Sequence, residues 1–237
     1  MVFSGGPCAP AGRNLVSETL EEKRRIWLLW ATVFPILGAL VVAGSFTVYW
    51  YNISATGPGI VGTEGIYYES SDIQWGLMTA ACQGNLPCTA GGWASSAVQS
   101  MYNCMAALSV LSLLLGLLAA IGAIRQRSGA APIRFLHPSL LATTATLVEL
   151  AVPVALGLLQ PWVLGRSLGA SEASGDTCFS IGGATQSFLG SCVSNVDQSM
   201  SIWGPTEGWF MAIFAGIFLL GGALVLYLNR KPIPATT

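Results

Sequence analysis

Long runs of apolar residues alternate with polar stretches along this chain. A helix needs roughly 20 apolar residues, each rising 1.5 Å, to cross the hydrocarbon core of a bilayer. Four runs are long enough, and they cover residues 26–51, 101–124, 139–164 and 209–228. The first has no charged residue, and the third has one, Glu149. Because backbone polar groups cannot go unpaired in lipid, each run is predicted to be a membrane-spanning helix.

The stretches between these runs complete the predicted organisation. We expect an N-terminal segment at 1–25, a short loop at 125–138 and a C-terminal tail at 229–237. Longer loops at 52–100 and 165–208 join the first span to the second and the third to the fourth. The predicted fold class is therefore an all-α membrane protein, a bundle of four transmembrane helices. The first span is too long for a secretory signal, whose apolar core is roughly 7–15 residues.

The composition agrees with a membrane protein. Hydrophobic residues make up 53% of the chain and charged residues 9%, whereas a soluble domain carries roughly a quarter of charged residues. The formal net charge of -1 argues against a nucleic-acid partner bound through overall positive charge. We therefore expect the lipid bilayer to surround most of the molecule. We expect no nucleic-acid partner.

The basic residues predict the orientation in the membrane. Nine of the ten Lys and Arg residues flank the spans on one side, and only Arg166 lies on the other. The positive-inside rule then places both termini and the short middle loop in the cytoplasm. The expected location is the plasma membrane, with the two long loops outside.

The two outer loops are acidic, with seven Asp and Glu residues against Arg166. An acidic outer face can attract cations or basic partners. The alternative is that small polar loops simply need charge for solubility. The sequence leaves both interpretations open.

Four of the six cysteines lie in the outer loops in even pairs. Cys82 and Cys88 lie in the first loop, and Cys178 and Cys192 lie in the second. On the oxidising side of a membrane such pairs indicate two disulfides. We predict pairing within each loop; pairing between the loops is the alternative, because four cysteines permit three connectivities.

The first outer loop has two strand-like stretches, at 65–69 and 73–78, separated by Ser70, Ser71 and Asp72. The second loop is expected to add a strand at 176–181. Together these predict a small β cap, pinned by disulfides, over the outer helix ends. Asn52 begins an Asn-Ile-Ser pattern and is a candidate glycosylation site.

A short motif carries a family resemblance. Trp75, Gly76 and Leu77 precede the close cysteine pair in the first outer loop. With four spans and cytoplasmic termini, this resembles the superfamily of claudins and peripheral myelin protein, whose pattern is Gly-Leu-Trp, two residues, Cys, and a second Cys eight to ten residues later. Met78 stands where the family has Trp, one extra residue precedes Cys82, and the cysteine spacing is shorter.

The resemblance implies a structural signature and no catalytic site. In such a protein the disulfide pins two strands, and the Gly-Leu pair seats the sheet on the helix ends. A claudin-like pore would use acids such as Glu64, Glu69 or Asp72 for charge selectivity.

Glu149 is the one charged residue within a predicted span. A carboxylate at mid-membrane costs several kcal/mol, so it should be protonated, paired or facing a polar cavity. A structural interpretation has it hydrogen-bonded between helices, with Thr146 or Asn103 available. Proton or ion handling, and contact with a partner protein, are the alternatives.

Enzyme signatures are missing from the sequence. There is no nucleophile elbow, phosphate loop or paired intramembrane acids, and the single His, His137, lies at the predicted cytoplasmic start of the third span. We expect no enzyme, cofactor or metal. The expected function is claudin-like interaction with other membrane proteins or with itself, as a membrane-domain organiser, cell-contact component or auxiliary subunit of a channel or receptor. The alternative is a small transporter or ion channel that uses Glu149.

Overall fold

The computed structural model describes residues 12–60, 66–83, 91–93, 95–129, 137–168, 187–193 and 200–229. The long helices in this part are α1 (Gly12–Ser45), α2 (Ser96–Arg127), α3 (Pro138–Leu168) and α5 (Glu207–Leu228). The strands are β1 (Tyr49–Ile60), β2 (Ile66–Gly76), β3 (Ala80–Gln83), β4 (Gly190–Val193) and β5 (Met200–Pro205).

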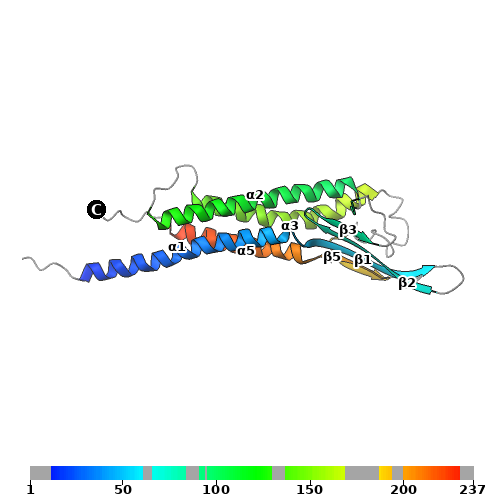
Figure 1. Ribbon diagram of the computed structural model, residues 1–237, viewed down its shortest axis with the longest axis horizontal. Coiled ribbons are helices and arrows are strands. Elements are labelled where there is room, and N and C mark those ends of the chain that lie inside the picture. Colours follow the sequence, from blue (N-terminus) through cyan, green and yellow to red (C-terminus); the bar gives the residue numbers. More distant parts are fainter. Residues whose placement is uncertain are drawn as a thin grey trace, which may run out of the picture.

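The helices lie side by side in an elongated bundle, and the strands extend beyond one end of it (Figure 1). We call this the sheet end. The start of α1 and the finish of α5 lie at the opposite end, which we call the terminal end (Figure 1). All four helices are long and apolar enough to cross a membrane. This agrees with the prediction of four spanning helices, and the chain is an integral membrane protein.

The helices pack as a ring in chain order. The contacting pairs are α1 with α2, α2 with α3, α3 with α5, and α5 with α1. Small residues let them approach closely: a Cβ on Gly216 would lie 2.3 Å from Leu150 Cδ2, and one on Gly38 would lie 2.8 Å from Leu219 Cγ. Large apolar side chains such as Leu147 and Leu158 are exposed on the outer surface of the bundle. In a membrane this surface contacts lipid.

The first helix ends earlier than the sequence predicted. We expected a span to residue 51, but α1 ends at Ser45 and β1 begins at Tyr49. Backbone bonds from Phe46 and Thr47 to the carbonyls of the preceding turn close the helix. The indole of Trp50 then donates to Ser45 O over 2.8 Å, which satisfies one of the carbonyls that a helix end leaves unpaired.

The sheet has the strand order β3-β2-β1-β5-β4, and every neighbouring pair is antiparallel. Both long loops contribute to it, because β5 of the loop between α3 and α5 pairs with β1 of the loop between α1 and α2. The two strands predicted at 65–69 and 73–78 are in fact one strand. The polar residues between them continue the ladder, with Ser70 opposite Thr56 and Asp72 opposite Ser54.

The second loop supplies its described strands at β4 and β5, while the strand predicted at 176–181 lies outside the described residues. Side chains alternate along the sheet as expected for one buried face. Tyr51, Ile53, Ile73, Trp75 and Trp203 are buried in a core shared with α2 and α3. The sheet is thus seated on the helix ends.

Candidate functional site

The Trp75-Gly76-Leu77 motif lies at the turn between β2 and β3. Trp75 and Leu77 are fully buried. The Gly76 amide donates to Thr79 O over 2.7 Å, and a Cβ on Gly76 would lie only 3.0 Å from the backbone oxygen of Val48. A larger residue would therefore separate β2 from the segment that follows α1. The motif therefore packs β2 against the segment that follows α1.

An aromatic cluster continues from this motif toward α2. The Trp75 ring stacks on Tyr51 at a centroid distance of 6.0 Å and lies 6.1 Å from the Tyr102 ring. Its indole N–H donates to Gly92 O over 3.3 Å. Burial raises the pKa of the Tyr51 phenol well above its usual range, because desolvation penalises the phenolate.

The order of the strands determines how far apart the cysteines of the sheet lie. Cys82 on β3 is disulfide-bonded, and Cys192 lies on β4 at the opposite edge of the sheet. Four inter-strand steps separate these edges, about 19 Å at ~4.8 Å a step, whereas a disulfide joins Cα atoms roughly 4.4–6.8 Å apart. This geometry excludes a bond between Cys82 and Cys192. Cys88 and Cys178 lie outside the described residues, so pairing within each loop stays a prediction.

Asn52 lies on β1, the central strand of the sheet, opposite Gln74 of β2 and Gly204 of β5. The residue is half-buried, and its Oδ1 atom is buried with no hydrogen-bond partner among the described residues. Glycan acceptors belong to surface loops. A position between two paired strands disfavours glycosylation.

Two of the three acids suggested for charge selectivity lie among the described residues. Asp72 is half-buried on β2, opposite Ser54. Glu69 lies on the same strand opposite Gly57. Glu64 lies outside the described residues. Their role stays a prediction.

Glu149 lies in the middle of α3 and is 0% exposed. Neither carboxylate oxygen has a hydrogen-bond partner within the described part of the chain. The partners suggested by the sequence are engaged elsewhere or turned away: Thr146 donates to Ala142 O over 2.8 Å, and Asn103 is exposed. Complete burial also leaves no surface of Glu149 for contact with a partner protein.

Two serines of α2 accompany this carboxyl. Ser112 lies beside Glu149, although the geometry between them falls short of a hydrogen bond, and its hydroxyl donates to Ala145 O over 3.1 Å. Ser109, one turn nearer the sheet end, is also fully buried, and its hydroxyl has no partner among the described residues. We call Ser109, Ser112 and Glu149 the polar seam between α2 and α3.

The sequence interpretation missed Ser109 and Ser112. Both lie in a run dominated by Leu and Ala, where a single Ser is unremarkable in a membrane span. Their spacing of three residues, which places them on one helix face, was the available signal. It identifies a face without showing that Glu149 lies opposite.

A second polar contact lies closer to the sheet. Tyr102 donates to Gln160 Oε1 over 3.0 Å, and both side chains are fully buried. Buried apolar side chains, including Met105, Val152 and Leu156, occupy the region between the helices on this side of the polar seam. The seam is therefore separated from the sheet end by an apolar layer.

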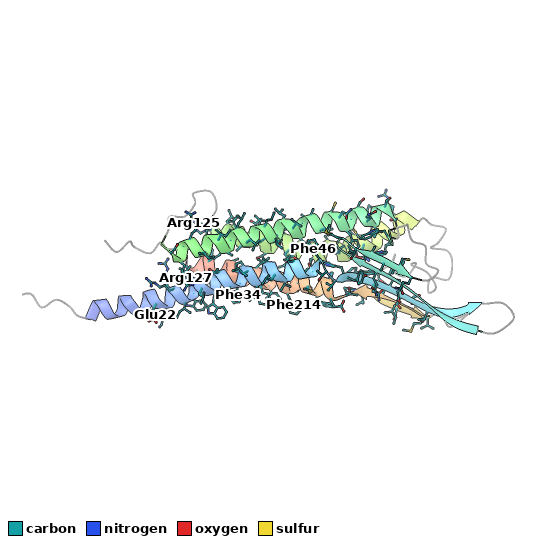
Figure 2. All side chains as sticks on the ribbon, in the orientation of Figure 1. Glu22, Phe34, Phe46, Arg125, Arg127 and Phe214 are labelled. Carbon is teal, nitrogen blue, oxygen red and sulfur yellow. The ribbon has the colours of Figure 1, made fainter. Side chains whose placement is uncertain are left out.

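Basic side chains gather at the terminal end. Figure 2 shows Arg125 and Arg127 where α2 ends, at the same end of the bundle as Glu22 of α1. Arg24 and Gln126 both donate to the backbone oxygen of Asn229, over 3.3 and 2.9 Å. These bonds tie α1 and α2 to the residue that follows α5.

Neither a protein-family model nor a curated protein matches the chain. In the described part of the chain, no group of three or more His, Cys, Asp and Glu side chains could hold a metal ion. The functional argument therefore rests on the polar seam and on the surface of the sheet.

Proposed function

We propose that this protein is a claudin-like membrane interaction protein that contacts other membrane proteins through its sheet. The supporting observation is an apolar patch on the sheet face that points away from the core. Val193, Met200 and Ile202 are 57%, 39% and 49% exposed. We call these three residues the outer patch.

The outer patch is continuous across two strands. Val193 of β4 lies opposite Met200 of β5, and Ile202 lies two residues further along β5, on the same face. Other outward positions of the sheet carry polar residues, including Asn52, Ser54 and Gln74. Exposed apolar patches rimmed by polar residues mark interaction surfaces.

Lipid is an unsuitable occupant for this patch. Ile202 precedes Glu207, the first residue of α5, by five residues, or ~17 Å of extended chain. The sheet continues along the long axis of the bundle, away from the helices (Figure 1). A protein surface outside the hydrocarbon core fits the patch better.

The orientation and the resemblance support the same proposal. Basic residues at the terminal end favour a cytoplasmic location for that end, which turns the outer patch to the cell exterior at the plasma membrane. Trp75, Gly76 and Leu77 hold the sheet on the helices, as a claudin-like protein requires.

The proposal is tested by changing the outer patch alone. Val193→Ser, Met200→Ser and Ile202→Ser are combined, and the protein is purified from native membranes in a mild detergent. We expect wild type to elute as a complex larger than its own mass and the triple variant to elute with less partner. Met78→Ser, at an apolar position that is 69% exposed on the β2–β3 turn, is the matched control. Wild type that elutes alone, or a complex equally weakened by Met78→Ser, would contradict the proposal.

A small transporter or channel is the second candidate, because the carboxyl oxygens of Glu149 have no hydrogen-bond partner among the described residues. In liposomes containing the purified protein, Glu149→Gln should then abolish ion or proton flux. Flux that is unchanged in this variant, or absent from wild type, would reject this candidate.

A further inference from the structure

The polar seam has more hydrogen-bond acceptors than donors. A carboxylate can only accept, and both oxygens of Glu149 are buried with no partner in the part of the chain that the structure describes. The hydroxyl hydrogen of Ser112 is used on Ala145 O. Ser109 can donate one hydrogen, which leaves at least one carboxylate oxygen without a donor.

Proline increases this imbalance. Pro153 lies four residues after Glu149 within α3, and proline has no amide hydrogen to donate to the carbonyl of the preceding turn. The backbone oxygen of Glu149 therefore loses its normal helical donor. The backbone of α3 therefore adds one more hydrogen-bond acceptor without its helical donor at the same residue.

Among the described residues of α2, α3 and α5, no charged side chain near the middle of the bundle could balance a negative charge on Glu149. The charged residues of α2, α3 and α5 other than Glu149 are Arg125, Arg127, Arg166 and Glu207, all within the first or last turn of their helices. The helices that pack against α3 are α2 and α5. Tyr102 and Cys104 are the other titratable groups of the intervening part of α2; Tyr102 is bonded to Gln160, and Cys104 is exposed. An isolated buried carboxylate costs several kcal/mol even after relaxation.

We propose that Glu149 is a proton-binding site and that its neutral carboxyl joins α2 to α3 through the two serines. The Ser109 hydroxyl donates to one carboxyl oxygen. The protonated oxygen donates to Ser112 Oγ, whose own hydrogen stays on Ala145 O. One proton, with small rotations of Glu149 and Ser109, gives a partner to every unpaired side-chain atom of the seam. This inference is independent of the proposed interaction function.

Infrared spectroscopy of the full chain in liposomes tests the protonation directly. A protonated carboxylic acid has a carbonyl stretch well separated from the carboxylate bands. At neutral pH we expect one such band in wild type, lost in Glu149→Gln and retained in the matched control Glu207→Gln. Ser112→Ala should move the band to higher frequency, because the carboxyl loses its acceptor. Absence of the band from wild type, or its persistence in Glu149→Gln, would overturn the proposal.

A sodium ion could supply the missing positive charge in place of a proton. Addition of NaCl at constant pH, with choline chloride as the ionic-strength control, separates the two ligands. We expect the band to be equal in both salts. A band that disappears in NaCl alone would replace the proton site with a cation site.

Discussion

The tryptophans of the sheet end and the acid in the middle of the bundle differ in how their buried polar atoms are paired. At the sheet end the indole N–H groups of Trp50, Trp75, Trp203 and Trp209 each donate to a backbone oxygen, over 2.8, 3.3, 3.1 and 3.0 Å. In the polar seam, both oxygens of Glu149 and the hydroxyl of Ser109 have no partner among the residues that the structure describes. At the sheet end the described residues leave the Tyr51 hydroxyl and Asn52 Oδ1 unpaired, but every one of these indole donors is bonded. The unpaired carboxyl of Glu149 is the group for which we propose a bound proton.

The backbone explains part of this difference. Helix ends and turns have unpaired carbonyls, and Ser45, Gly92 and Ser187 offer theirs to tryptophans. In mid-helix almost every carbonyl is already bonded within the helix. A carboxyl placed there must form its hydrogen bonds with side chains, or be protonated so that it can donate one itself.

The largest expected effect comes from removing a tryptophan of the sheet end. Trp75→Ala should lower the free energy of unfolding by roughly 3–5 kcal/mol, because a fully buried aromatic side chain leaves a cavity. Trp162→Ala is the control, since Trp162 is 59% exposed on α3. Thermal unfolding in detergent compares the two. Equal losses of stability would show that the sheet end is not the more tightly packed region.

A methyl group tests the contact between β1 and α5. A Cβ on Gly208 would lie 2.2 Å from Trp50 Cδ1, so Gly208→Ala should displace the indole and cost about 3 kcal/mol, the upper part of the range for overpacking. Gly157→Ala is the matched helical control, because its nearest neighbour would be an ordinary 3.7 Å away. The same unfolding assay should leave the control within experimental error of wild type. If the Gly208→Ala variant were as stable as the control, the close contact between Gly208 and the Trp50 indole would be contradicted.

The disulfide of Cys82 should contribute less to the free energy of unfolding than the two packing contacts above. If Cys82 pairs with Cys88, the closed loop is short, and the chain-entropy model gives about 2 kcal/mol. Cys82→Ser with Cys88→Ser should lower stability by this amount in oxidising buffer and by nothing in reducing buffer, with Cys104→Ser as the control. Mass spectrometry of unreduced peptides identifies the pair. A peptide linking Cys82 to Cys178 would establish pairing between the loops.

The smallest effect concerns the unpaired hydroxyl of Tyr51. Its raised pKa means that folding favours the neutral phenol, so its contribution to stability is complete below about pH 10, the usual phenol pKa, and decreases as the pH rises further. Tyr51→Phe should therefore be within about 1 kcal/mol of wild type at pH 7, because the hydroxyl has no partner to lose. Above pH 10 the variant should lose less stability than wild type, and Tyr49→Phe is the neighbouring control. Unfolding curves of Tyr51→Phe and wild type that fall in parallel above pH 10 would contradict this account.

Apolar run length was enough to predict the four spanning helices, because lipid leaves the backbone few alternatives. The end of α1 could not be predicted in this way. Tyr49, Trp50 and Tyr51 are as suitable for a membrane interface as for a strand, and only pairing with β2 and β5 selects the strand. Ser70, Ser71 and Asp72 gave a false turn for the same reason, since their partners on β1 are distant in sequence.

Glu149 was identifiable as exceptional from its position alone, but its surroundings were not. The sequence offered Thr146 on the same helix and Asn103 on α2, and the packing of α2 on α3 places Ser112 beside the carboxyl instead. The outer patch was likewise hidden, because Val193, Met200 and Ile202 become neighbours only when β4 pairs with β5.

The most direct test of the interaction function is photo-crosslinking in intact cells. A photoreactive amino acid replaces Ile202 in the outer patch, Gln74 on the polar part of the same sheet face, or Leu158 on the lipid-facing side of α3. We predict discrete protein adducts from position 202 that are weak or absent from the other two positions. Adducts of equal pattern from positions 202 and 74, or none from position 202, would contradict the proposal that the outer patch binds a protein partner.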